Sequence, residues 1–160
     1  TNSVNGRKDV LLEFAAPSIQ YFSNNGGKSF IITSFTKGQD ITGIASTLPI
    51  DSLSSAVGQA RLVPDSTISS PLGSGFPSLQ PTFIISGVSP FYMSTDAEEV
   101  YTGHLVKQGG WTGPNTVGAR RIADGKIYQY FFSVQLYKLD QQLSDLQILF
   151  DQILNNDFNW

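Results

Sequence analysis

The chain has 160 residues, no cysteine and one histidine, and only 14% of its residues are charged. Its length suits one domain whose core is large enough to fold without a metal or a disulfide. The absence of cysteine excludes thiol catalysis and cysteine-ligated metals, and a lone histidine excludes zinc sites with two or three histidine ligands. The formal net charge of −3 argues against a nucleic-acid surface. No apolar run reaches the about 18 residues that a membrane span needs.

The first third of the chain predicts short strands. Residues 1–9 are expected to form a flexible segment ahead of the domain. The alternation of Val10, Leu12 and Phe14 indicates a strand, and residues 19–22 indicate a second one. Two asparagines and two glycines at 24–27 have the composition of a hairpin turn, because these residues tolerate positive φ. Residues 28–36 carry apolar side chains on both sides and predict a strand buried on both faces.

Residues 38–90 predict a long loop region rich in serine, proline and glycine, and the alternative is a linker between two domains. Six of the eight prolines lie in it. Apolar pieces at 41–44, 59–63 and 82–88 are expected to form short strands. Residues 51–57 are expected to form a helical turn, because Asp51 and Ser52 are good N-cap residues.

The second half of the chain carries the clearest hairpin signal. Residues 100–107 predict one strand. Asp124 and Gly125 stand between two apolar runs, which predicts a type I′ turn joining strands at 116–123 and 126–139. On the returning strand one face is expected to carry Tyr128, Tyr130, Phe132, Val134 and Leu136, and the other Gln129, Ser133 and Gln135.

The C-terminal residues predict a helix. Asp140 is a suitable N-cap, and the apolar side chains that follow recur at helical spacing, at Leu143, Leu146, Phe150 and Ile153. We therefore predict a mainly β fold over residues 10–139, an antiparallel β-sandwich or a jelly-roll-like barrel. A C-terminal α-helix and an aromatic tail over residues 140–160 close it.

The loop around Trp111 is the strongest candidate for ligand or receptor recognition. Glycines flank the tryptophan, so the backbone there can approach a ligand closely. The polar side chains of Gln108, Thr112 and Asn115 could supply hydrogen bonds to a sugar stacked on the indole. The alternative is that Trp111 folds inward and caps the core.

The C-terminal helix and tail are the candidate assembly interface. Their apolar and aromatic side chains either cover the sheet of the same chain or anchor a neighbouring subunit. The residues concerned are Leu146, Phe150, Ile153, Phe158 and Trp160.

Three polar features have plain structural interpretations. The cluster of Asp96, Glu98 and Glu99 suits a solvated turn better than a divalent-ion site or the paired carboxylates of a glycosidase. His104 is interpreted as a hydrogen-bonded structural or surface histidine. The doublet at 120–121 is interpreted as a solvated strand edge that discourages pairing with other chains.

No phosphate-binding, dinucleotide-binding, nucleophile-elbow or metalloprotease motif occurs in the sequence. We therefore expect a non-catalytic structural or recognition domain without cofactor or metal. Low charge, polar loops and aromatic strands favour a coat, projecting capsid or decoration domain of a viral or phage particle, in the virion or outside the cell. Such a domain would form homo-oligomers and present loops to a glycan or host-surface receptor. The alternatives are a carbohydrate-binding or adhesin module that uses Trp111, and a small β-fold glycosidase that uses the acidic cluster.

Overall fold

The computed structural model describes residues 10–33, 35, 41–53, 59–64, 66–108, 113–139 and 143–160, without the side chains of 10–13, 59, 60, 87, 107, 108 and 143. The strands are β1 (Ser29–Ile32), β2 (Ile50–Leu53), β3 (Gln59–Leu62), β4 (Ile68–Ser69), β5 (Ile85–Val88), β6 (Phe91–Met93), β7 (Ala97–Gly103), β8 (Val106–Gln108), β9 (Thr116–Ala123) and β10 (Lys126–Phe132). The helical elements are α1 (Val10–Asn24), the 3₁₀ turns η1 (Ala45–Thr47) and η2 (Leu136–Lys138), α2 (Leu143–Asp151) and the π-helical turn η3 (Gln152–Asp157).

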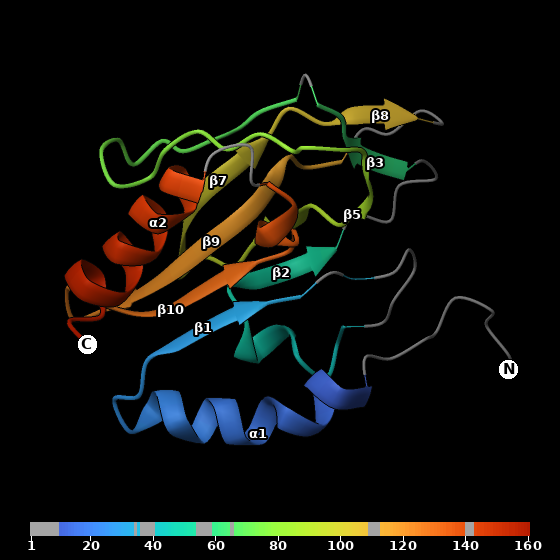
Figure 1. Ribbon diagram of the computed structural model, residues 1–160. Helices are drawn as coiled ribbons and strands as arrows, with labels where there is room; N and C mark the ends of the chain where they lie inside the picture. The colour runs from blue at the N-terminus through green and yellow to red at the C-terminus, as the bar shows by residue number, and fades with distance from the viewer. Residues whose placement is uncertain are drawn as a thin grey trace, which may run out of the picture.

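The described strands form a central five-stranded sheet in the order β1-β10-β9-β7-β4, together with a β2-β6 pair and a β5-β3-β8 sheet. Helix α2 lies on one side of the central sheet and α1 on the other (Figure 1). The prediction of a mainly β fold with a C-terminal helix is confirmed. The sheets are open, and β1 pairs with β10 in parallel, so the central sheet is mixed. The expected sandwich or jelly roll is not confirmed.

Strand β10 separates two hydrophobic cores. The first core, on the α2 side, includes Val100, Tyr130, Phe132, Leu149, Ile153 and Phe158. The second core, on the α1 side, includes Ala16, Phe35, Ile44, Leu48, Phe91 and Phe131. Consecutive strand residues face opposite sides, so Phe131 enters one core while its two neighbours enter the other. The predicted inward face is confirmed from Tyr130 to Leu136.

The predicted turn at Asp124 and Gly125 is present. Their φ angles are 52° and 72°, and the flanking residues Ala123 and Lys126 are paired across the hairpin. Positive φ at both central positions is the requirement of a type I′ turn.

Helix α1 replaces the strands predicted before residue 24. Ala16 is buried in the second core, and Ile19 and Ser23 follow at helical spacing with partly buried side chains. Pro17 lies inside the helix, where it removes one backbone hydrogen bond. The short apolar pieces fitted a period of two as well as a helical period, and the strand prediction was wrong.

The residues predicted to form a hairpin turn after α1 terminate that helix. The Gly26 N–H donates to Ser23 O and the Gly27 N–H to Phe22 O, while Gly26 has a φ of 79°. This is a Schellman motif, which needs the same left-handed glycine as a hairpin turn does. Glycine chemistry alone therefore did not distinguish the two.

The loop-rich middle of the chain is partly as predicted. Strands β3 and β5 lie within the predicted ranges 59–63 and 82–88. Residues 41–44 form a turn leading into η1, and residues 51–53 belong to β2, so the expected strand and helical turn are wrong there. The single strand predicted at 100–107 is two strands, β7 and β8, separated by His104 and Leu105.

The C-terminal helix α2 continues into the π-helical turn η3, which includes Asn155 and Asn156. Its expected cap, Asp140, lies outside the described residues, as do residues 1–9. Phe158 then enters the first core with no exposed surface. Within the described part of the chain, no helix combines the length and apolarity of a membrane span.

The tail residue Phe158 is expected to carry much of the stability of this helix. Phe158→Ala should lower the free energy of unfolding by about 3–5 kcal/mol, because it empties a buried site. Trp160→Ala is the control: its side chain is 69% exposed, and about 1 kcal/mol or less is expected. Urea denaturation of the variants measures both values, and equal losses would contradict this assignment.

The hairpin gives a second stability test. Gly125→Val should cost about 1 kcal/mol or more, because a β-branched residue is strained at positive φ. Gly125→Asn keeps a residue that tolerates this conformation and should cost less. Thermal or urea unfolding distinguishes them, and a valine variant as stable as the parent would mean that the turn is misassigned.

Candidate functional site

Two adjacent arginines on β9 lie on opposite faces of the central sheet. Strand β9 is paired on both sides, with β10 and β7, so the prediction of a solvated edge at 120–121 is wrong. The side chains of Arg120 and Arg121 are only 14% and 10% exposed. A buried guanidinium needs compensating charge and hydrogen bonds. Arg120 and Arg121 obtain them from different partners.

Arg120 joins the sheet to the end of the C-terminal helix. Its Nε lies 2.7 Å from Glu98 Oε2, and its Nη1 lies 3.2 Å from the Tyr130 hydroxyl and 3.7 Å from Asp157 Oδ2. The guanidinium also lies over the Phe76 ring, 5.8 Å from its centroid. Two carboxylates and an aromatic face thus surround one buried charge.

The Tyr130 hydroxyl donates to the Asp157 carboxylate within this network. Burial raises the pKa of Tyr130, and the bond to Asp157 raises it further, so the phenol remains a donor across the physiological range. Burial alone would lower the pKa of Arg120, but its bonds to Tyr130 and Glu98 outweigh that effect and raise it. Gln152 Nε2 donates to the other Asp157 oxygen over 2.8 Å. These contacts fasten η3 to the sheet.

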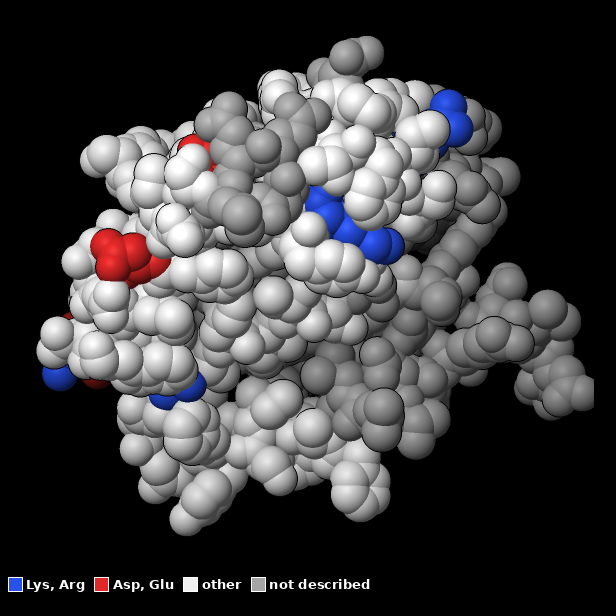
Figure 2. Space-filling model, viewed as in Figure 1, with Lys and Arg blue, Asp and Glu red and all other residues white. Residues whose placement is uncertain are grey.

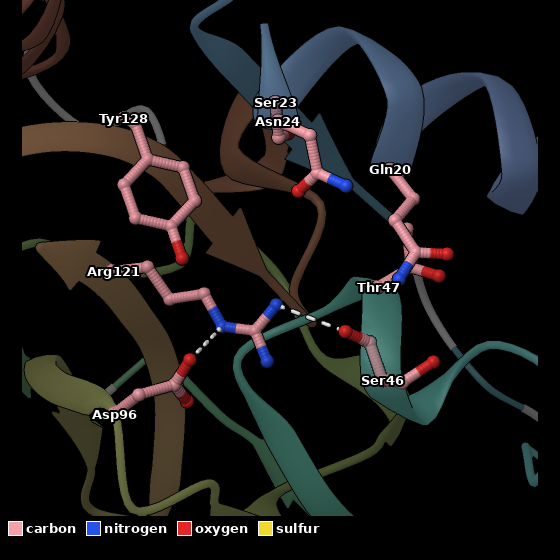
Figure 3. A pocket seen from close by; sticks show the side chains of 8 residues that line it. All are labelled: Gln20, Ser23, Asn24, Ser46, Thr47, Asp96, Arg121 and Tyr128. Atoms are coloured by element: carbon pink, nitrogen blue, oxygen red, sulfur yellow. Dashed lines mark hydrogen bonds and ion pairs between the residues drawn. The ribbon is translucent and has the colours of Figure 1, made fainter. Parts of the chain in front are cut away.

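Arg121 lines a polar pocket on the opposite face (Figure 3). The pocket has a volume of about 170 Å³ and lies between α1, η1 and the central sheet. Its lining is Gln20, Ser23 and Asn24 from α1, Ser46 and Thr47 from η1, Asp96 before β7, Arg121 from β9 and Tyr128 from β10. Every lining residue carries a hydrogen-bonding side chain.

The guanidinium of Arg121 has two described polar contacts. Nε lies 2.9 Å from Asp96 Oδ2, an ion pair whose angle is not that of an aligned hydrogen bond. Nη1 donates to Ser46 O over 3.2 Å. A guanidinium carries more N–H donors than these contacts use, and in Figure 3 the hydroxyl of Tyr128 points toward it.

Asp96 forms the solvent-exposed rim of the pocket, with its side chain 52% exposed. Partial burial would raise the pKa of its carboxyl. The hydrogen bond from Ser94 Oγ, 2.5 Å long, and the charge of Arg121 outweigh that effect and lower the pKa. Asp96 is therefore ionised at neutral pH and neutralises the charge of Arg121.

Three buried polar atoms at or beside the pocket have no hydrogen-bond partner among the described residues: Ser23 Oγ, Gln129 Oε1 and Arg121 Nε, which has only its ion pair with Asp96. Ser23 lines the pocket. Gln129 is not among the lining residues, but its Nε2 donates to the carbonyl oxygen of the lining residue Thr47 over 3.0 Å. Buried polar atoms are usually paired, so the pocket wall holds unused hydrogen-bonding capacity.

The predicted recognition loop is only partly described. Trp111 and Thr112 lie outside the described residues. Gln108 ends β8, and its side chain is likewise not described. Asn115 is exposed, and its carbonyl accepts from the Gly103 N–H over 2.8 Å. The recognition role of this loop stays a prediction.

The predicted assembly residues have different placements. Leu146, Ile153 and Phe158 are buried in the first core of their own chain, and Phe150 packs against that core. Their apolar surface is used to cover the sheet of the same chain, and a part for them in assembly stays a prediction. Trp160 is the one of the five that is largely exposed.

The acidic cluster does not form one site. Asp96 pairs with Arg121, Glu98 with Arg120, and Glu99 Oε1 accepts from Thr116 Oγ1 over 2.6 Å. No group of three potential metal-ligating side chains is found among the described residues.

His104 is exposed, and its Nδ1 lies 2.7 Å from Thr67 Oγ1. It is the hydrogen-bonded surface histidine that the sequence predicted.

The pocket residues were missed from the sequence for local reasons. Gln20, Ser23 and Asn24 share a pocket only because residues 10–24 are helical. Tyr128 was expected beside Tyr130, but the register of β10 shifts between Ile127 and Gln129 and places it at the pocket. The one available signal was a charged doublet, Arg120 and Arg121, within an otherwise apolar strand.

No family model, no curated protein and no solved structure matches this chain. The pocket and the surfaces around it therefore have to be interpreted from their own chemistry.

The pair of Asp96 and Arg121 predicts a pH dependence of stability. Folding lowers the pKa of Asp96 below its ordinary value of 3.8, so its contribution is present above that value and is lost as the pH falls through the folded pKa. The parent should therefore be more stable than Asp96→Asn at neutral pH, and this difference should disappear in acid.

Asp124→Asn is the matched control, because it also removes one carboxylate and keeps a residue that tolerates the turn. Urea titrations between pH 2 and pH 7 measure the difference. If Asp96→Asn still had a lower free energy of unfolding than the parent at the lowest pH, the ion-pair assignment would be contradicted.

Proposed function

We propose that this chain is a non-catalytic recognition and assembly domain that binds a second copy of itself through helix α1. The observation that carries this proposal is an exposed aromatic surface, which we call the outer face of α1, formed by Phe14, Ser18, Tyr21 and Phe22. The side chains of Phe14, Tyr21 and Phe22 are 87%, 72% and 53% exposed.

The packing of α1 within its own chain does not account for this surface. A surface helix normally directs its large apolar side chains to the core. Among the described side chains of α1, Ala16, Ile19 and Ser23 are buried or partly buried and Gln20 lines the pocket, while the rings of Phe14, Tyr21 and Phe22 are exposed. Clustered exposed aromatics mark interaction sites in folded proteins.

The charge distribution favours a second copy as the partner. Residues 14–27 contain no charged side chain, and Figure 2 shows an uncharged surface on the described part of the molecule below β1, where α1 lies. An uncharged aromatic face offers no complement to a charged partner and no repulsion against its own copy. Helices related by a twofold axis would bring the same rings together from both subunits.

The remaining parts of the functional hypothesis stay predictions. Low charge and polar loops support a viral or phage particle and a location in the virion or outside the cell. Separate partners for the three carboxylates of the acidic cluster support a non-catalytic role over a glycosidase.

The assembly proposal is tested by sedimentation velocity over a range of concentrations. The parent should dimerise, and Phe14→Ser combined with Tyr21→Ser should shift it to monomer with an unchanged circular dichroism spectrum. Aromatic anchors at interfaces contribute about 2 kcal/mol or more, so each loss should raise the dissociation constant about 30-fold.

Tyr137→Ser is the control, since Tyr137 is 69% exposed but lies in η2, outside α1. It should leave the dimer intact. A parent that is monomeric at all concentrations, or a Tyr137→Ser variant that dissociates equally, would overturn the proposal.

A further inference from the structure

The Arg121 pocket has the size of a single small ring. Its volume is about 170 Å³, and a cavity of about 150 Å³ already holds a six-membered ring. Gln20 and Asn24 are exposed and Asp96 is half exposed, so the mouth is open to solvent. A ligand of one ring can enter and leave without unfolding the protein.

The charge of the pocket favours a neutral ligand. Arg121 contributes one positive charge and Asp96 one negative charge, 2.9 Å apart, and the other lining residues are uncharged. A phosphate or carboxylate would have to displace Asp96 from the guanidinium or bind beside a second negative charge. A neutral ligand leaves the ion pair in place.

The hydrogen-bonding groups of the pocket call for a ligand that both donates and accepts. Gln20 and Asn24 offer amide donors and acceptors, and Ser23, Ser46, Thr47 and Tyr128 offer hydroxyls. Arg121 adds fixed donors and Asp96 a fixed acceptor. Hydroxyl groups around a ring match such a mixed lining, because each can donate to one neighbour and accept from another.

One buried atom lacks the partner that such a ligand would supply. Ser23 Oγ lines the pocket and has no hydrogen-bond partner among the described residues. A ligand hydroxyl in the pocket would pair with it.

We infer that the pocket between α1, η1 and the central sheet binds one ring of a neutral polyhydroxylated ligand, a monosaccharide unit. Arg121 and Asp96 orient its hydroxyls, Ser23, Asn24 and Tyr128 complete the contacts, and no bond in the ligand is broken. This site is separate from the outer face of α1 and does not depend on dimerisation.

The test is a titration of the full chain, followed by amide chemical shifts in nuclear magnetic resonance. The probes are glucose, galactose, mannose and N-acetylglucosamine, with acetate and inorganic phosphate as charged comparisons. At least one sugar should bind saturably and shift amides in residues 20–24, 46–47 and 121–128. No saturable binding of any sugar, or binding of acetate or phosphate in their place, would overturn the inference.

Two variants test whether the sugar binds in this pocket. Asn24→Ala and Tyr128→Phe should each weaken the sugar about fivefold, the effect of one lost hydrogen bond. Asn155→Ala and Tyr92→Phe are matched controls on exposed residues outside the pocket. Asn24 is exposed at the end of α1, so its variant keeps the test available even if Tyr128→Phe folds poorly. If both pocket variants bound the sugar with the affinity of the parent, the assignment of the sugar to this pocket would be overturned.

The Phe14→Ser, Tyr21→Ser variant separates this inference from the assembly proposal. It should remain able to bind the sugar as a monomer. Loss of sugar binding together with the dimer would overturn the inference of an independent site.

Discussion

Every layer of this protein depends on the burial of β10 on both faces. Tyr130, Phe131 and Phe132 have no exposed surface, and consecutive residues enter different cores. A strand in this position needs a cover on each side, which α2 with η3 supplies on one face and η1 with α1 on the other. Because β10 is apolar on both faces, the fold needs a helical cover on each side of it.

The same alternation explains why adjacent arginines have different surroundings. On the face of Arg120, two carboxylates, a phenol and an aromatic ring surround the guanidinium. On the face of Arg121 the cover is α1, whose residues beside Arg121 are the polar Gln20, Ser23 and Asn24, and a pocket remains between them and the sheet. A one-residue step along β9 therefore separates a structural charge from one that lines an open site.

Local chemistry made some elements predictable. The turn at Asp124 and Gly125, the alternation of β10 and the C-terminal helix follow from positive φ, a period of two and a helical period. The sequence did not distinguish a helix from strands at 10–24, because the segment fits both periods and its glycines suit a helix end as well as a hairpin. The pocket was not predictable, since it needs that helix, a register shift at Tyr128 and the pairing of β9 on both sides.

The parallel pairing of β1 with β10 has a consequence for the order of folding. Ser29 and Gln129 are 100 residues apart, whereas the β9–β10 hairpin closes over a two-residue turn. Closing a long loop costs more chain entropy than closing a short one, so distant pairings form late. The hairpin would then serve as the template, with β1 and the helix ahead of it added near the end of the reaction. Because α1 supplies one wall of the pocket, the pocket would be among the last features to form in a newly made chain.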